Sequence, residues 1–436
     1  MNLPQLAALR RIQNINITVL AFGLSGLWAS LAVIILPTLV LDFVSADQKN
    51  SYLAIISIAG LIIALVMSPV AGALSDRLSF FGWRRRPYII IGVVGTLAFL
   101  PGIALAGSIW WLLAVLCAIQ VCSNLALGAF NSFIPAFVPH EDRGAVSGLK
   151  TVLDGAGAAL MVVVVGFLLD GYVPPAGKGY LWGAVSLIGG GLLFTGLWTV
   201  VGVRQDRADV VPARAQPRQA SVAPGDEEED RAHPDFPWFL LSRFIVITAT
   251  SALQTFALFF LQDVVKVSDP SRAISVLAVS AGTGALVVTL ASGILSDRIG
   301  RRPLILSSGF VGVVGVLLLL TIHDMRGVIV VGTVLGLSSG LFLSANWALA
   351  SDLVSKWATG LQMGLVNVAT AGAGLLARAA GFLIDALNKN GGAQGYKTVI
   401  ILSALLLFIG TLLILLVRPE RKRKASGAVV PVAPTD

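Results

Sequence analysis

The sequence predicts an all-α integral membrane protein of twelve transmembrane helices in two six-helix, pseudo-symmetric halves. Its 436 residues are 56% hydrophobic and only 12% charged, whereas soluble domains are about 25% charged. Apolar runs of about twenty residues, enough to cross a hydrocarbon core, recur from Ile15 to Val417. Because they are apolar on all sides rather than alternating, they are typical of helices and not of barrel strands.

The apolar runs place the twelve helices at 15–44, 51–74, 88–108, 110–136, 147–170, 179–203, 237–263, 272–294, 304–322, 327–350, 359–385 and 397–417. The first run follows Arg10 and Arg11, as a signal peptide would. It is too long for a cleaved hydrophobic region and is interrupted by Trp28 and Pro37, so we interpret it as a retained helix.

The basic residues predict the orientation. If both termini lie on one side of the membrane, 23 of the 31 Lys and Arg residues fall on that side and seven fall on the other. By the positive-inside rule, we expect a multi-pass protein of the cell inner membrane with both termini cytoplasmic. The basic residues border apolar spans, so they indicate a lipid bilayer as partner and no nucleic acid.

The composition divides the chain into four parts. We expect an N-terminal six-helix bundle at 1–203, a charged cytoplasmic linker at 204–236, a C-terminal bundle at 237–424 and a cytoplasmic tail at 425–436. The linker contains the acidic run 225–230, which is either a solvated charge block or a segment that binds a partner.

Two sequence repeats relate the halves. GALSDR at 72–77 recurs as GILSDR at 293–298, and each is soon followed by Arg-Arg-Pro. GFLLD, which ends at Asp170, recurs as GFLID, which ends at Asp385. Two echoes in the same order indicate duplicated halves. Parallel halves of this kind are one plan of secondary transporters, with the substrate site near midplane between them.

The second-half repeat continues as GILSDRIGRRPL, and in this form it resembles the loop signature of the major facilitator superfamily. The longer first-half loop is similar to that of sucrose/proton symporters and their glycoside-pentoside-hexuronide relatives. The segment 131–137 departs from those symporters, because it lacks their arginine and acid. The resemblance implies a gating contact on the cytoplasmic side, which one conformation has and the other lacks. Its residues are Gly72, Asp76, Arg77, Arg84, Arg85, Gly293, Asp297, Arg298, Gly300 and Arg301.

The same resemblance places helices 1, 4, 7 and 10 around the substrate cavity. Amides and aromatic rings on these helices suit a neutral polyol or sugar, because amides bind hydroxyl groups and rings stack on apolar faces. The same groups also suit hydrogen bonds between helices. The candidate cavity residues are Trp28, Gln120, Asn124, Asn131, Gln254, Asn346 and Trp347.

Charged residues inside spans are costly, and each is therefore a functional hypothesis. Asp154 follows Lys150 by four residues on the same helix face. It either takes up and releases a coupling proton or forms an ion pair with Lys150 that only stabilises the protein or gates the transport pathway. Arg378 has no counterpart in the first half. It either binds an anionic substrate, pairs with an acid across the halves, or extends toward the interface with Asp385.

These observations favour secondary active transport of a small molecule by alternating access. No phosphate-binding loop is present, the three histidines fall in predicted loops, and the two cysteines do not share a helix face. We therefore expect no enzyme activity, no cofactor and no metal, and we expect a monomer. The leading interpretation is proton-coupled uptake of a sugar or glycoside. The alternatives are proton-driven efflux of amphipathic compounds and a transporter-like scaffold without flux.

Overall fold

The computed structural model describes residues 13–77, 85–131, 133–138, 143–172, 177–203, 234–353, 359–389 and 392–417. All regular structure within these residues is helical. Twelve helices are long and apolar enough to cross a membrane. The twelve predicted spans are thus confirmed, with ends that differ by a few residues.

The N-terminal half supplies six spans. Its first span is a composite of an α-helix, a π-helical turn and a second α-helix, and the others are single helices with short extensions. The elements are α2 (Leu20–Ser30), η1 (Leu31–Ile35), α3 (Leu36–Phe43), α4 (Lys49–Arg77), α5 (Arg86–Phe99), α6 (Pro101–Ala104), α7 (Ile109–Asn131), α8 (Phe133–Phe137), α9 (Arg143–Leu168), η2 (Leu169–Gly171) and α10 (Lys178–Gly202).

The C-terminal half repeats this plan, and its first span also contains a π-helical turn. The elements are α11 (Phe236–Phe260), η4 (Leu261–Val265), α12 (Pro270–Ile299), α13 (Arg301–Leu318), η5 (Leu319–Thr321), α14 (Met325–Leu353), α15 (Thr359–Asn388), α16 (Gln394–Leu413) and η6 (Ile414–Leu416). Most of the predicted linker, residues 204–233, and the tail at 425–436 lie outside the described residues.

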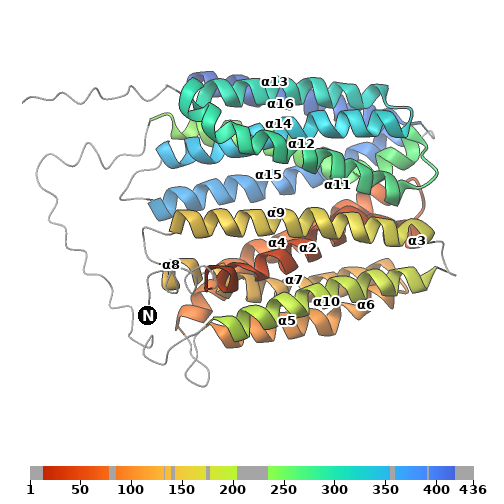
Figure 1. Cartoon of the computed structure of the whole chain (residues 1–436). Coiled ribbons are helices and arrows are strands. Elements are labelled where there is room, and N and C mark those ends of the chain that lie inside the picture. The colour runs from red at the N-terminus through yellow and green to blue at the C-terminus, as the bar shows by residue number, and fades with distance from the viewer. Residues whose placement is uncertain are drawn as a thin grey trace, which may run out of the picture.

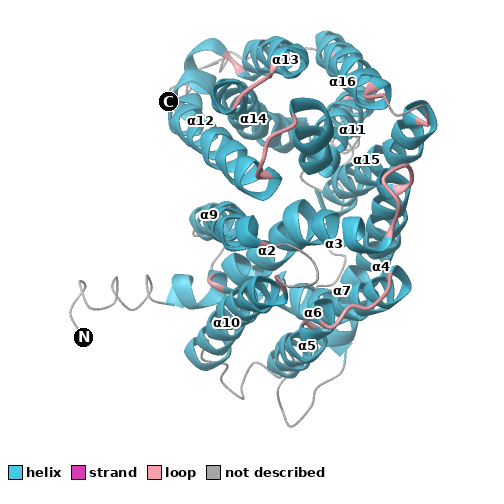
Figure 2. Ribbon diagram, turned by 90° about the vertical axis from the view of Figure 1, so that its right-hand side faces the viewer, coloured by secondary structure: helices cyan, strands magenta, loops and turns pink. Residues whose placement is uncertain are grey.

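The two halves lie side by side, with the first half in the lower part of Figure 1 and the second half in the upper part. Figure 2 shows the bundle turned by 90°, with α4 beside α15 and α9 beside α12. These two helix pairs form the boundary between the halves.

Small residues allow helices to approach closely within each half. A Cβ atom on Gly157 of α9 would lie 2.7 Å from the Cα of Phe22 in α2, and one on Gly284 of α12 would lie 2.5 Å from the Thr333 carbonyl oxygen of α14. Large apolar side chains meanwhile remain exposed along the spans, including Val152 at 67% and Leu286 at 63%. Close helix packing with an apolar exterior is typical of bundles in lipid.

The bundle has two ends, which we name by their residues. The network end carries Lys49, where α4 begins, and the motif end carries Arg77, where α4 ends. At the motif end, the single residue Gly300 separates α12 from α13 and has φ 94°. This conformation is essentially limited to glycine. The glycine of the sequence motif therefore makes the tight turn between these two helices.

Candidate functional site

A cavity of about 440 Å³ lies at the boundary between the halves. The first half contributes α2, η1 and α9, and the second contributes α11, η4, α12, η5, α14, α15 and α16. The lining is mostly Ala, Val, Leu, Ile and Phe, and its polar side chains are those of Gln254, Ser339 and Tyr396. The cavity is therefore suited to an apolar or amphipathic molecule.

The two π-helical turns lie beside this cavity. Val33 of η1 and Leu261 of η4 both line it, one from each half. A π-helical turn inserts one extra residue per turn and is found mainly at functional positions. Its presence in the first span of both halves places a local helix irregularity on each side of the cavity.

The sequence-predicted cavity residues are only partly brought together. Gln254 lines the cavity. Gln120 and Asn124 bond to each other instead, because the Asn124 Nδ2 donates to the Gln120 Oε1 at 2.8 Å and to its carbonyl oxygen at 2.9 Å. Trp28 is half-buried against the core, and Asn131 is exposed where α7 ends.

Asn346 is fully buried and accepts a hydrogen bond from the Nη1 of Arg243. The Arg243 Nε donates to the Thr370 hydroxyl at 3.2 Å. Arg243 lies within the predicted span 237–263, and its side chain is only 3% exposed inside α11. These bonds join α11, α14 and α15 within the second half. The side chain of Trp347 lies outside the described residues.

Lys150 and Asp154 form an ion pair on α9, with 2.9 Å between the Lys150 Nζ and the Asp154 Oδ2. The Ser25 hydroxyl of α2 donates to the other carboxylate oxygen of Asp154 at 2.7 Å. Both charged side chains remain partly exposed, at 24% and 35%. The carboxylate therefore connects two helices that also contribute to the cavity, and solvent can reach it.

Arg378 neither pairs with Asp385 nor extends toward the interface. Its Nη1 donates to the Gly374 carbonyl oxygen one turn earlier in α15, at 2.8 Å. Its Nε is buried and has no partner among the described residues.

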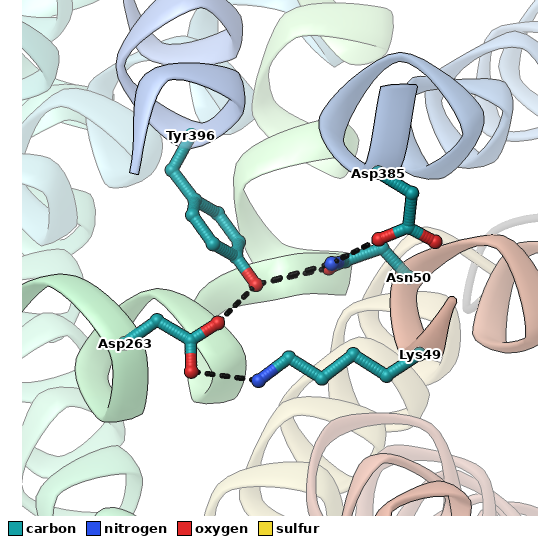
Figure 3. Close-up of polar contacts among 5 residues, drawn as sticks. All are labelled: Lys49, Asn50, Asp263, Asp385 and Tyr396. Carbon is teal, nitrogen blue, oxygen red and sulfur yellow. Dashed lines mark hydrogen bonds and ion pairs between the residues drawn. The ribbon is translucent and has the colours of Figure 1, made fainter. Parts of the chain in front are cut away.

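The network end holds a set of polar side chains that join the two halves (Figure 3). We call Lys49, Asn50, Asp263, Asp385 and Tyr396 the inter-half network. The Lys49 Nζ forms an ion pair with the Asp263 Oδ1 at 2.7 Å, and the Tyr396 hydroxyl donates to the other oxygen of Asp263 at 2.8 Å. The Asn50 Nδ2 donates to the Asp385 Oδ1 at 2.8 Å and to the Tyr396 hydroxyl at 3.1 Å.

The inter-half network also holds the beginning of α4. The Ser51 backbone N–H donates to the Asp385 Oδ2 at 2.6 Å. A carboxylate at a helix N-terminus is stabilised by the unpaired N–H groups and by the helix dipole. Asp385 of the second half therefore caps a helix of the first half. Lys49, Asn50 and Tyr396 are at most 3% exposed, whereas the Asp263 side chain is 30% exposed, so water is excluded from most of the contact but still reaches Asp263.

Sequence reasoning did not identify the inter-half network. Lys49 lies just before the predicted span 51–74, and Asp263 lies at the end of the predicted span 237–263. The only available signal was that Lys49 and Asp263 border apolar runs from different halves.

The predicted gating motif lies at the motif end and is described in part. Gly72, Asp76 and Arg77 belong to α4, and Gly293, Asp297 and Arg298 belong to α12, but their side chains lie outside the described residues. Arg84 also lies outside them.

The motif residues after the two turns are described. Arg85 precedes α5 and lies 5.8 Å from the Phe137 ring centroid, as measured from its guanidinium carbon. Arg301 begins α13, and the neighbouring Arg302 donates from Nη2 to the Leu415 carbonyl oxygen of η6. The Tyr88 hydroxyl of α5 donates to the Leu74 carbonyl oxygen of α4 at 3.2 Å. The described residues thus anchor the helices that begin and end at this motif.

Twelve spans in two halves around a shared cavity define a membrane transporter of the major facilitator type. The sequence profile described as MFS/sugar transport protein matches residues 20–418, and the chain belongs to this family. The resemblance predicted from the loop motifs is therefore confirmed.

Comparison with individual proteins supports the same fold. The chain is 21% identical over 358 residues to the multi-drug resistance efflux pump PmrA of Streptococcus pneumoniae, covering 78% of this chain and 82% of PmrA. A bacterial homologue of the human lysosomal transporter Spinster, inward-facing and occupied, superposes with TM-score 0.68 at 16% identity, covering 93% and 96% of the two chains. The nucleoside transporter NupG superposes with TM-score 0.66 at 15% identity, covering 93% and 99%.

Proposed function

We propose that this chain is a secondary active transporter that moves a small amphipathic solute across the cell inner membrane by alternating access. The observation that carries the proposal is the lining of the central cavity, in which Gln254, Ser339 and Tyr396 are the polar side chains. A sugar requires many hydrogen-bonding groups, whereas an amphipathic compound requires apolar area and a few polar contacts. The efflux-pump relative supports export as the direction.

The inter-half network supplies the conformational switch in this proposal. Its contacts cross the boundary between the halves, so the network end can open only if the Lys49–Asp263 ion pair and the Asp385 cap of α4 break. A contact made in one state and lost in the other biases the equilibrium between them. With both termini cytoplasmic, as the basic residues favour, the network end lies on the side of the membrane opposite the cytoplasm.

Asp154 is the proposed site of proton coupling. It is partly exposed, bonds to both Lys150 and Ser25, and connects α9 with α2. Uptake of a proton would remove the charge that binds Lys150 and would change the contact between these helices. In proteoliposomes, Asp154→Asn should abolish accumulation driven by a pH gradient but retain substrate exchange. Unchanged pH-driven accumulation would refute this role.

A ligand screen tests the substrate class. Both halves of one chain line the cavity, so the purified monomer should bind substrate. We expect amphipathic aromatic compounds to raise the free energy of unfolding by about 2.7 kcal/mol at a hundred times their dissociation constant. Ala281→Phe, which fills the cavity, should remove the effect.

A second candidate, proton-coupled uptake of a sugar or glycoside, is favoured by the family description and by Gln254 in the cavity. Stabilisation by disaccharides alone would establish that candidate. Binding without flux in proteoliposomes would instead indicate a transporter-like scaffold.

A further inference from the structure

Tyr396 belongs both to the cavity lining and to the inter-half network. It lines the cavity together with Val399 and Ile400 of the same helix, α16. The other four residues of the inter-half network are not part of the lining. Tyr396 is therefore the member of the network that a solute in the cavity contacts directly.

The Tyr396 hydroxyl is already engaged in the network. Figure 3 shows it directed at Asn50 and Asp263. It donates to the Asp263 Oδ2 at 2.8 Å and accepts from the Asn50 Nδ2 at 3.1 Å. Because its only proton is given to Asp263, the surface that Tyr396 still offers a solute is mainly that of its ring. A tyrosine ring presents apolar area to one side while its hydroxyl bonds on the other.

The backbone that carries Tyr396 is fixed against α15. A Cβ atom on Gly395 would lie 2.4 Å from the Ile384 carbonyl oxygen, and the Gly395 N–H donates to the Asn388 side-chain oxygen at 2.8 Å. A solute that presses on the Tyr396 ring therefore rotates the side chain more readily than it shifts the start of α16. The hydroxyl is at the far end of the side chain, so rotation moves it furthest, and hydrogen bonds weaken steeply as their geometry departs from the optimum.

Two other cavity residues lie close to the network along the chain. Ile384 of α15 lines the cavity and directly precedes Asp385. Leu261 lines it from η4, the π-helical turn that also contains Asp263. These residues reach the network only through the backbone, whereas Tyr396 reaches it with its own hydroxyl. An experiment on the hydroxyl alone separates the two routes.

We propose that Tyr396 couples substrate occupancy to the conformational switch. A solute in the cavity displaces the Tyr396 ring, the hydroxyl leaves Asp263 and Asn50, and opening of the network end is then favoured. A ligand shifts a conformational equilibrium only if it interacts differently with the two states, and Tyr396 supplies this difference. This inference rests on the proposed function and adds to it the residue through which the substrate controls the switch.

The test measures the distance between spin labels at Asp47→Cys and Ser268→Cys, exposed positions of the two halves, in the full chain without Cys117 and Cys122. The probe is 2-naphthamide, a neutral amphipathic aromatic compound. At saturation it should raise the ratio of network-open to network-closed molecules in this parent by about tenfold or more, as loss of a hydrogen bond to a charged group does. In Tyr396→Phe the ratio should already be raised, and the probe should change it by about twofold or less. Calorimetric titration should show that Tyr396→Phe binds the probe at least as tightly as the parent, because binding no longer breaks these bonds.

Two variants are matched controls. Lys49→Met breaks the ion pair with Asp263 and should raise the ratio without probe, but it keeps the Tyr396 bond and should retain the shift that the probe causes. Tyr52→Phe removes a hydroxyl from a tyrosine of α4 that is outside the cavity lining, and it should change neither quantity. If the Tyr396 hydroxyl merely stabilised the closed network, Tyr396→Phe would behave like Lys49→Met.

A shift by the probe in Tyr396→Phe that is as large as in the parent would overturn the inference. Absence of any shift in the parent at saturation would overturn it as well. In either case, 2-naphthamide binding that Ala281→Phe abolishes would leave the proposed function intact, because Ala281 lines the cavity away from the network. If 2-naphthamide does not bind the parent, the proposed function fails and the inference fails with it.

Discussion

Removal of the Lys49 charge should open the network end. Lys49→Met leaves Asp263 without its cation while Tyr396 still donates to it. Breaking a buried ion pair costs about 3–5 kcal/mol and an exposed pair contributes about 0–1 kcal/mol. The Lys49 side chain is 4% exposed but that of Asp263 is 30% exposed, so the pair lies between these limits. We expect a bias of about 1–3 kcal/mol, or about 5- to 150-fold, in the ratio of network-open to network-closed molecules.

Spin labels across the boundary measure this ratio. Asp47→Cys and Ser268→Cys place labels at exposed positions of the two halves near the inter-half network. The background replaces the free thiols Cys117 and Cys122 with serine. Pulsed electron paramagnetic resonance should show a longer distance population in Lys49→Met.

A matched control and a double-mutant cycle test the cause. Lys389→Met removes an exposed lysine at the same end and should leave the distances unchanged. Lys49→Met and Asp263→Asn together should shift the ratio by less than the sum of the two single changes, because both remove one contact. An unchanged distance distribution in Lys49→Met, or single effects that add within about 0.5 kcal/mol, would refute the reasoning.

Three further predictions concern close contacts. Gly300→Ala should lower the free energy of unfolding by about 1–3 kcal/mol, because the residue has φ 94°. Gly190→Ala, at an open helical position, is the control and should be neutral or stabilising. Thermal unfolding of the two variants compares the effects. Gly381→Ala should favour the network-open state, because the new Cβ atom would lie 2.3 Å from the Asn50 carbonyl oxygen, and the same spin-label pair reports it. Ala278→Phe should weaken ligand binding by about tenfold or more at unchanged thermal stability, because the new ring takes up cavity volume that the apolar part of the ligand would occupy. Titration calorimetry measures this affinity.

The number and position of the spans could be predicted from sequence because lipid imposes one simple requirement. Every spanning backbone must satisfy its own hydrogen bonds, so each span is a helix of predictable length and hydropathy. The tight turn at Gly300 was not predicted, because the apolar runs ended at 294 and began again at 304, whereas in the structure α12 and α13 extend until one residue joins them. The spans themselves depend on local sequence.

The composition of the site depends on contacts between distant segments. Gln120 and Asn124 have the spacing of a polar helix face, but an i, i+4 pair of amides can bind each other as readily as a ligand. Lys49 and Asp263 are separated by 214 residues, and each resembles an ordinary flanking charge. Hydropathy locates the end of a span but does not determine which two ends meet across the halves.

The duplicated halves use one repeated acid in two different ways. Asp385 ends the GFLID repeat and caps α4 through the Ser51 N–H. Its repeat partner Asp170 belongs to η2, which packs against α12, but its Oδ1 is buried and has no partner among the described residues. The helix that η2 contacts, α12, begins with Pro270.

The α9–α12 contact relies on close packing instead, because a Cβ atom on Gly166 would lie 2.8 Å from the Ser271 carbonyl oxygen. The contacts of α4 with α15 and η4 lose hydrogen bonds and an ion pair when they open, whereas the α9–α12 contact loses mainly van der Waals packing. Dispersion contacts weaken steeply with separation and carry no charge. The free energy that favours closure of the network end should therefore come mainly from the Asp263 and Asp385 contacts. A change in the charge of a side chain at these contacts should alter that free energy.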